Sequence, residues 1–397
     1  MTTDQILDRI LIPRPNGSEG LEQVAIYIAE TLRRSGAAVT FHEFTATPHG
    51  FQLAWSAALL LVIGYVASIA ARRYGLALVL IVATAVLLLL EFELQRSPVS
   101  GLLPLTERNV VGAFPGRADG PRLIFCAHYD TTTHFGDHFS WGTWGFRQGP
   151  ATGAAVALAL TGLWRRRRGK ELARAVTIPL AALTALPFAA MFWFQTVGPL
   201  LRTPSPGAID NGGSVAALLR FSEQLGARAE GAATTVTLVF LAAEEERTLG
   251  SRAYAQTLDT GDPIAVFNLE SVGASDDLAY IPEDGFALRR YRSPDRIVTF
   301  LNQTAQQLWG AGLPPGELPA GTLTDGRSFL ARGIPTVTLR AFTGDSFPRR
   351  LHSEHDSRDR LSVRAIDRSA DLLHALVARA DANPGWIENL GRGEVFR

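Results

Sequence analysis

Four long stretches without a charged side chain constrain this sequence more than any other feature. They cover residues 51–71, 74–90, 148–164 and 175–201. A helix needs about 20 apolar residues to cross the hydrocarbon core of a bilayer, and about 17 is the lower limit. The first and last stretches meet this requirement, the second meets it narrowly, and the third, rich in Ala and Gly, is marginal. Long buried core helices are the alternative, but stretches so free of charge favour transmembrane helices.

The rest of the sequence alternates strand and helix patterns. Between 20 and 34, Leu21, Val24, Ile28 and Leu32 fall on one helical face. Strands are predicted at 37–44, 109–114, 122–127, 236–242, 265–269 and 336–340, and helices at 20–34, 214–225, 298–309 and 363–380. This alternation predicts an α/β fold, with a mostly parallel or mixed central sheet flanked by helices and interrupted by about four transmembrane helices.

The uncharged stretches lie inside the α/β pattern rather than before or after it. We therefore predict one domain assembled from 1–50, 95–147 and 202–397, with a first transmembrane hairpin over 51–94 and a second over 148–201. An even number of crossings in each insertion keeps the three pieces on one side of the membrane. This requirement supports the marginal third helix.

Charge and cysteine content narrow the function. The formal net charge is zero, so the chain lacks the electrostatic footprint of a nucleic-acid-binding protein. Cys126 is the sole cysteine, which excludes an intrachain disulfide and a thiolate-rich metal site. A metal site would have to use His and carboxylate ligands.

Polar side chains follow several predicted strands at the point where each strand ends. Because the carboxyl ends of parallel strands meet at one edge of a sheet, we expect these groups to converge there. Adding two candidates from loops gives His128, Asp130, Asp210, Glu244, Glu245, Glu270 and His352. Imidazole and carboxylate ligands of this kind suit zinc or a related divalent ion.

The motifs around these residues occur in a recognisable order. They are Arg14–Ser18, Ala127–Asp130, Gly207–Ser214, Glu244-Glu245 with Gly250-Ser251, Asn268–Glu270, Thr324-Asp325 with Phe329 and Gly333–Pro335, and His352 with Asp356. Together they resemble the zinc aminopeptidase family that includes bacterial leucyl aminopeptidase, aminopeptidase S and glutamate carboxypeptidase. The resemblance covers residues 1–44, 108–131 and 206–380.

The resemblance implies a role for each candidate. Asp210 would bridge two zinc ions, His128 and Glu270 would complete one site, and Glu245 and His352 the other. Glu244 would be the general base. Asp130 would accept the second N–H of the His128 imidazole and fix its tautomer.

The sequence departs from the family pattern at three positions near these motifs. Glu270 stands where the family usually has Asp, Arg247 where it has Gly, and Leu351 where an aromatic residue is common. Arg247 could act on substrate or face water. His355 is an alternative ligand to His352, although the family spacing of His and a later Asp favours His352.

We therefore predict a membrane-bound di-zinc aminopeptidase whose partners are a peptide and the lipid bilayer. Basic residues cap both predicted hairpins, at 72–73 and 165–170, which predicts cytoplasmic tips and an extracytoplasmic catalytic domain. Because the second hairpin separates His128 from Asp210, we expect the active-site mouth near the bilayer surface. The sequence sets neither the substrate-binding residues nor the oligomeric state.

Two other functions fit the same resemblance. Glutaminyl cyclases share the fold and use a single zinc ion, but Asn211-Gly212-Gly213 after Asp210 looks more like the peptidases. A non-catalytic membrane receptor or scaffold is the second alternative. Such members lose metal ligands, whereas this sequence keeps a complete set.

Overall fold

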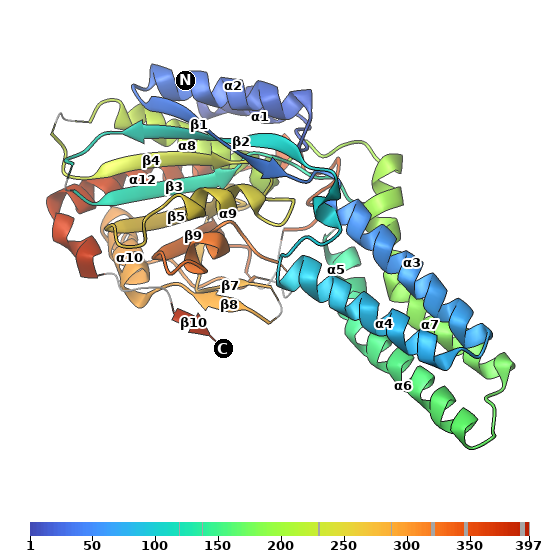
Figure 1. Ribbon diagram of the computed structural model, residues 1–397. Helices are drawn as coiled ribbons and strands as arrows, with labels where there is room; N and C mark the ends of the chain where they lie inside the picture. Colours follow the sequence, from blue (N-terminus) through green and yellow to red (C-terminus); the bar gives the residue numbers. More distant parts are fainter. Residues whose placement is uncertain are drawn as a thin grey trace. The chain divides into compact units, whose positions relative to one another are not determined.

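The computed structural model describes residues 1–118, 120–136, 138–228, 231–286, 288–318, 322–344, 348–389 and 394–396. It divides into two compact units, each made of discontinuous segments (Figure 1). The sheet unit comprises Met1–Ala46, Leu105–Thr132 and Pro204–Arg397. The helical unit comprises Thr47–Pro104 and Thr133–Thr203.

A seven-stranded mixed sheet organises the sheet unit. Its order is β1 (Ala38–Ala46), β2 (Leu105–Phe114), β4 (Thr235–Leu241), β3 (Arg122–His128), β5 (Ile264–Glu270), β9 (Thr336–Ala341) and β6 (Leu278–Ile281). The four strands β4, β3, β5 and β9 are parallel, while β1, β2 and β6 run antiparallel to their neighbours. A small second sheet has the order β10 (Glu394–Phe396), β8 (Arg290–Arg292) and β7 (Glu283–Gly285). The predicted α/β class and mixed sheet are confirmed.

Helices cover both faces of the large sheet. Along β3, Leu123, Phe125 and Ala127 enter one apolar core, and the alternate residues Ile124 and Cys126 enter another. The first core is shared with α1 (Thr3–Ile10), α2 (Glu19–Arg34), α8 (Gly213–Leu225), α10 (Asp295–Trp309) and α12 (Val363–Ala382). The second is shared with α9 (Leu249–Gln256) and α11 (Gly326–Leu330). Strands buried on both faces explain the nearly continuous apolar runs in the sequence.

Four long helices pack together in the helical unit. They are α3 (Gly50–Ala70), α4 (Tyr74–Leu88), α6 (Gln148–Arg167) and α7 (Arg174–Phe192), with the shorter α5 (His138–Phe146) preceding α6. Their shared core includes Tyr65, Ile81, Ala159 and Phe188, one from each long helix. A Cβ at Gly162 would lie 2.3 Å from the Tyr74 ring. The small residues of α6 therefore allow close helix packing, which explains why this stretch is rich in Ala and Gly.

Three segments of the helical unit are long and apolar enough to cross a membrane, judged by length and composition within the described residues. They are Gly50–Ala70, Tyr74–Glu93 and Arg174–Leu201. The last two extend α4 and α7 through short helical segments, namely the π-helices η1 (Leu89–Glu93) and η3 (Trp193–Val197) and the 3-10 helix η4 (Gly198–Leu201). The fourth predicted span, α6, forms a helix of 20 residues but is not among the three.

Candidate metal centre

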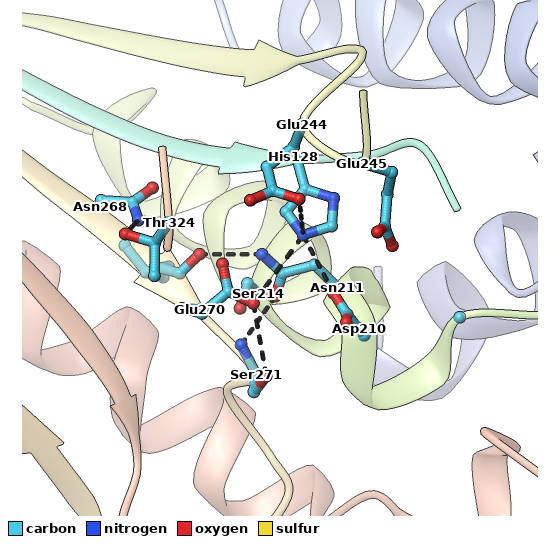
Figure 2. A network of polar contacts seen from close by, with 12 residues as sticks. His128, Asp210, Asn211, Ser214, Glu244, Glu245, Asn268, Glu270, Ser271 and Thr324 are labelled. Atoms are coloured by element: carbon cyan, nitrogen blue, oxygen red, sulfur yellow. Dashed lines mark hydrogen bonds and ion pairs between the residues drawn. The ribbon is translucent and has the colours of Figure 1, made fainter. Parts of the chain in front are cut away.

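The candidate residues come from adjacent strand ends of the sheet unit. His128 is the last residue of β3 and Glu270 is the last residue of β5, while Glu244 and Glu245 follow β4. Since β4, β3 and β5 are neighbours in the parallel part of the sheet, their carboxyl ends lie at one edge. Figure 2 shows these side chains gathered near Asp210, which precedes α8.

Asp210 lies between two imidazoles. Its Oδ1 is 3.0 Å from Nε2 of His128, and its Oδ2 is 3.0 Å from Nε2 of His352. Each imidazole has a second carboxylate neighbour: His128 Nε2 is 3.8 Å from Oε1 of Glu270, and His352 Nε2 is 3.2 Å from Oε2 of Glu245. The five residues thus form two groups that share Asp210.

Glu244 and Asp130 lie beside the His128 group. Oε2 of Glu244 is 4.0 Å from His128 Nε2, and Oδ1 of Asp130 is 3.5 Å from His128 Nδ1. The buried Asp130 carboxylate also accepts the backbone N–H groups of Glu244 and Glu245, both at 3.2 Å. Asp130 therefore holds the turn after β4 as well as lying against the His128 ring.

Burial and like charge govern the electrostatics of the cluster. Burial raises the pKa of Glu244 well above its ordinary value and that of Glu245 to about 7. Burial by itself would lower the pKa of His128, but Glu244 and the other carboxylates reverse the shift and hold it well above the ordinary value. The same reversal, driven chiefly by Glu245, raises the pKa of His352. The cluster therefore favours positive charge at its centre.

The donor set fits a divalent cation. One ligand atom each from His128, Asp210 and Glu245 lie within 4.8 Å of one another. Neither ring nitrogen of the buried His128 forms a hydrogen bond of good geometry with the described residues, and the same holds for Oε1 of Glu245. Buried polar atoms without partners are rare in proteins, and a bound metal ion satisfies such atoms.

The turn that carries Asp210 is fixed on two sides. Asp356 accepts the backbone N–H groups of Ile209 at 2.7 Å and Asp210 at 3.1 Å. The side-chain amide of Asn211 donates to the carbonyl oxygen of Leu269 at 2.9 Å. Its oxygen accepts the backbone N–H of Ser271 at 3.0 Å (Figure 2). Asp356 and Asn211 belong to the recognised motifs, but their roles were not predicted from the sequence.

A second buried polar network supports the end of β5. The Asn268 amide donates to Oγ1 of Thr324 at 3.1 Å (Figure 2). That hydroxyl in turn donates to Oδ2 of Asp284 at 2.5 Å. The adjacent Asp325 is fully buried, and burial raises its pKa to about 7. The Thr324-Asp325 pair was a motif match only. The structure places it beside the strand that ends in Glu270.

Several residues around the cluster have left-handed backbone conformations. Their φ values are 56° at Ala243, 68° at Arg247, 51° at Ser271 and 58° at His352. Non-glycine residues rarely adopt such angles, and those that do concentrate at functional sites. The angle at Arg247 explains why a glycine suits this position. Arg247 is buried, so the expectation that it could face water is wrong.

His355 does not join the cluster. Its side chain is 57% exposed and lies 3.8 Å from Glu354. His352, in contrast, is buried against Asp210 and Glu245. Of the two candidate histidines, only His352 has the position that a ligand requires.

Comparisons with known proteins agree with this geometry. Residues 194–377 match the family model described as Peptidase family M28. The fold resembles a glutaminyl cyclase from Porphyromonas gingivalis (15% identity, TM-score 0.54, covering 95% of this chain and 98% of that chain). It also resembles an aminopeptidase from Aneurinibacillus sp. strain AM-1 (16% identity, TM-score 0.54, covering 95% and 93%). A Zn-dependent exopeptidase from Parabacteroides distasonis also has a similar fold (15% identity, TM-score 0.54, covering 96% and 98%).

No curated protein matches the sequence. The family match and the shared fold confirm the resemblance to the zinc aminopeptidase family that the sequence motifs indicate. The same fold occurs in glutaminyl cyclases.

Proposed function

We propose that the chain is a membrane-bound metallopeptidase that uses two zinc ions to remove N-terminal residues from peptides. The position of Asp210 carries this proposal, because its two oxygens face two different imidazoles at 3.0 Å each. A carboxylate shared in this way is what a two-metal hydrolytic site requires. His128 and Glu270 would hold one ion, and Glu245 and His352 the other.

The protein's own residues supply binding, orientation and proton transfer. When bound, zinc polarises a carbonyl group and lowers the pKa of water. Glu244 would act as general base and then return the proton to the leaving amine. Burial raises the pKa of Glu244, which is the direction needed to hold a proton transiently near neutral pH. Asp130 holds the backbone that carries Glu244, and its Oδ1, 3.5 Å from Nδ1 of His128, would orient the His128 ring.

The second candidate function is glutaminyl cyclisation, which the shared fold keeps open. The resemblance implies one zinc ion for a cyclase and two for a peptidase. Glu270 lies 3.8 Å from His128, so the chain provides two carboxylates for that imidazole, counting Asp210. A complete second ligand group favours the peptidase.

Peptide mass separates the candidates. The purified chain would be incubated with zinc and a peptide that begins with Gln, and with a matched peptide that begins with Leu. A peptidase shortens the peptide by one residue, whereas a cyclase removes ammonia from the Gln peptide alone. The Glu244→Gln variant is the control, since it should abolish either product. Absence of both products across a panel of N-terminal residues would favour a non-catalytic role.

The helical unit supports membrane insertion. At about 1.5 Å per residue, the 21 residues of α3 and the 20 of α6 each span about 30 Å, the thickness of a bilayer core. Around the packed core, α3, α4 and α7 expose apolar side chains such as Leu60, Val79 and Leu183. Outward leucine and valine are expected where lipid is the solvent. We infer that α6 also spans the membrane, because it packs into the same core.

Aromatic and basic residues lie at different ends of these helices. Phe51, Trp55, Phe92 and Trp144 pack together near the start of α3. At the other end, Nη1 of Arg166, in the last turn of α6, donates to the carbonyl oxygen of Arg72 in the connection between α3 and α4, at 2.9 Å. Aromatic residues favour membrane interfaces and clustered arginine favours the cytoplasmic side. This supports cytoplasmic tips and an extracytoplasmic sheet unit.

Single-cysteine labelling tests the orientation. Cys126 is fully buried, so a new cysteine reports with little background. Lys170→Cys lies at the basic tip, and Thr260→Cys lies on an exposed loop of the sheet unit. In intact cells, a membrane-impermeant maleimide should label the Thr260 variant only, and lysis should expose the Lys170 variant. The reverse pattern would place the sheet unit in the cytoplasm.

A further inference from the structure

Arg14 is a fully buried arginine in the segment between α1 and α2. Its guanidinium lies within hydrogen-bond distance of five backbone carbonyl oxygens. Nε faces that of Tyr129, Nη2 faces that of Gly207, and the two N–H groups of Nη1 face those of Ile10, Ile12 and Pro206. The Nη1–Pro206 and Nη2–Gly207 distances are 2.6 Å and 2.9 Å. A guanidinium has five N–H donors in a fixed plane, so this arrangement uses a geometry that no other side chain offers.

The Arg14 backbone forms two further hydrogen bonds, both with Thr131. Its N–H donates to Oγ1 of Thr131 at 2.9 Å, and its carbonyl oxygen accepts the N–H of Thr131 at 3.1 Å. With the bond from Nε to the Tyr129 carbonyl oxygen, Arg14 holds residues 129–131 through three contacts. Through Nη1 and Nη2 it holds residues 206–207.

These two segments have a particular place in the chain. Tyr129 directly follows His128, and Gly207 lies three residues before Asp210. Between them, the chain leaves the sheet unit after Thr132 and returns to it at Pro204. Arg14 therefore joins the two ends of a 71-residue excursion, 133–203, at the points nearest to two proposed metal ligands.

Gly207 is shaped for this contact. Its φ is +59°, and a Cβ would lie 2.2 Å from Cγ2 of Thr131 and 3.2 Å from Nη2 of Arg14. Glycine alone lets the 206–207 carbonyl groups approach the guanidinium and Thr131 together. Burial lowers the pKa of Arg14 to about 10, and the carboxylates of Asp356, Asp130, Asp210 and Glu245 oppose this shift, so the guanidinium stays protonated at neutral pH.

We propose that Arg14 is a positioning residue that sets the separation of His128 and Asp210 by holding together the two ends of the inserted segment 133–203. We call the contacts of Arg14 with residues 129–131 and 206–207 the Arg14 clamp. The expected loss of zinc affinity when the clamp is broken rests on the proposed function, whereas the clamp itself does not. Three of its carbonyl partners, Tyr129, Pro206 and Gly207, lie at the two ends of the segment, and they are reached from three different nitrogens of one rigid plane. A lysine has a single nitrogen with three donors and cannot replace this arrangement.

The experiment compares Arg14→Lys and Gly207→Ala with Arg33→Lys in the detergent-purified full chain. Arg33 is exposed in the last turn of α2 and provides a matched Arg-to-Lys control. Hydrogen exchange of the metal-free protein, followed by mass spectrometry, reports on 129–131 and 206–212 directly. Arg14→Lys and Gly207→Ala should each increase exchange in both segments, while Arg33→Lys leaves both unchanged.

Zinc affinity, measured by competition with a chelator, gives the second readout. Loss of a group that orients ligands typically weakens metal binding about 10–100-fold, and we expect this for both clamp variants. The Co²⁺-substituted variants should also show a changed visible spectrum. If Arg14→Lys does not fold, Gly207→Ala gives the second test. It keeps the guanidinium and displaces the 206–207 backbone, because the new Cβ would meet Thr131 and the carbonyl oxygen of Asp210 as well as Nη2 of Arg14.

Unchanged exchange in both segments in a folded clamp variant would overturn the proposal. Unchanged zinc affinity together with increased exchange would also overturn it, because the ligand separation would then not depend on the clamp. A wild-type chain that binds no zinc would instead refute the proposed function, and the exchange data would still judge the clamp.

Discussion

Asp356 binds the backbone of Asp210 across a sequence separation of 146 residues, accepting its N–H at 3.1 Å. The same carboxylate accepts the N–H of Ile209, and the Asp356 carbonyl oxygen accepts the N–H of Ala208 at 3.0 Å. Since Asp356 lies four residues after His352, one short segment carries a candidate ligand and fixes the turn that bears another.

Asp356→Asn should weaken zinc binding. An amide offers one acceptor oxygen in place of two, so one of the N–H groups of Ile209 and Asp210 would face an NH₂ group. Changes to groups that orient metal ligands cost about 10–100-fold in metal affinity, which chelator competition measures. The control is Asp359→Asn, whose carboxylate is exposed and accepts from Ser357. Equal zinc affinities for the two variants would show that Asp356 does not contribute to metal binding.

Glu244→Gln should abolish turnover while leaving metal bound. The glutamine is similar in size but cannot accept a proton, and general-base catalysis contributes about 10²–10⁴-fold. We therefore expect kcat to fall by about that factor, with zinc content equal to that of the wild type. Activity within a few-fold of the wild type would show that another group moves the proton.

Glu270→Asp tests the departure from the family pattern. Glu270 Oε1 lies 3.8 Å from His128 Nε2, and a side chain shorter by one methylene withdraws the carboxylate from its neighbour. We expect weaker zinc binding in the aspartate variant and still weaker binding in Glu270→Ala, measured by titration at fixed pH. Tighter binding by the aspartate variant would mean that the backbone of β5 already favours the shorter ligand.

Asp381→Asn should destabilise the sheet unit at neutral pH only. Burial raises the pKa of Asp381, but hydrogen bonds from Arg228 and Thr234 lower it by more, so its folded-state pKa is below the ordinary value. A carboxylate with a lowered folded-state pKa stabilises the fold at pH values above its unfolded-state pKa of about 3.9. This stabilisation is lost as the pH falls through the folded-state pKa.

The loss at pH 7 should be on the order of 1 kcal/mol, since the ion pair is only partly buried. Melting temperatures of metal-free wild type and variant should differ at pH 7 and converge towards pH 3. Asp371→Asn serves as the control. Asp371 lies on α12, as Asp381 does, and its exposed carboxylate accepts a hydrogen bond from Gln224 of α8. A difference that persists at pH 3 would assign the effect to packing rather than charge.

Much of the fold and the candidate site follows from patterns that the sequence displays directly. The long buried strands β3, β4 and β5 read as apolar runs, and their ends locate His128, Glu244 and Glu270 because parallel strands share an edge. Hydrophobic periodicity likewise predicts α2, whose Ser18 accepts from the N–H of Leu21 at its start.

Other features have no such signal. Strands β7 and β8 have three residues each, too few for a pattern. Arg14 binds backbone carbonyl groups, which every residue has, so its partners leave no trace in the sequence. Arg247 is buried and has a left-handed backbone angle that is typical of glycine, which the arginine itself does not indicate. Helix α6 owes its place to small residues, which a hydropathy argument undervalues.

Zinc content of the purified full chain tests the central claim most directly. After loading with zinc and removal of free metal, elemental analysis of wild type and Asp210→Ala should give about two ions per chain for the wild type and a large loss for the variant, since both ions depend on one shared carboxylate. A wild type that retains no zinc, or an Asp210→Ala chain that retains as much as the wild type, would contradict the shared site.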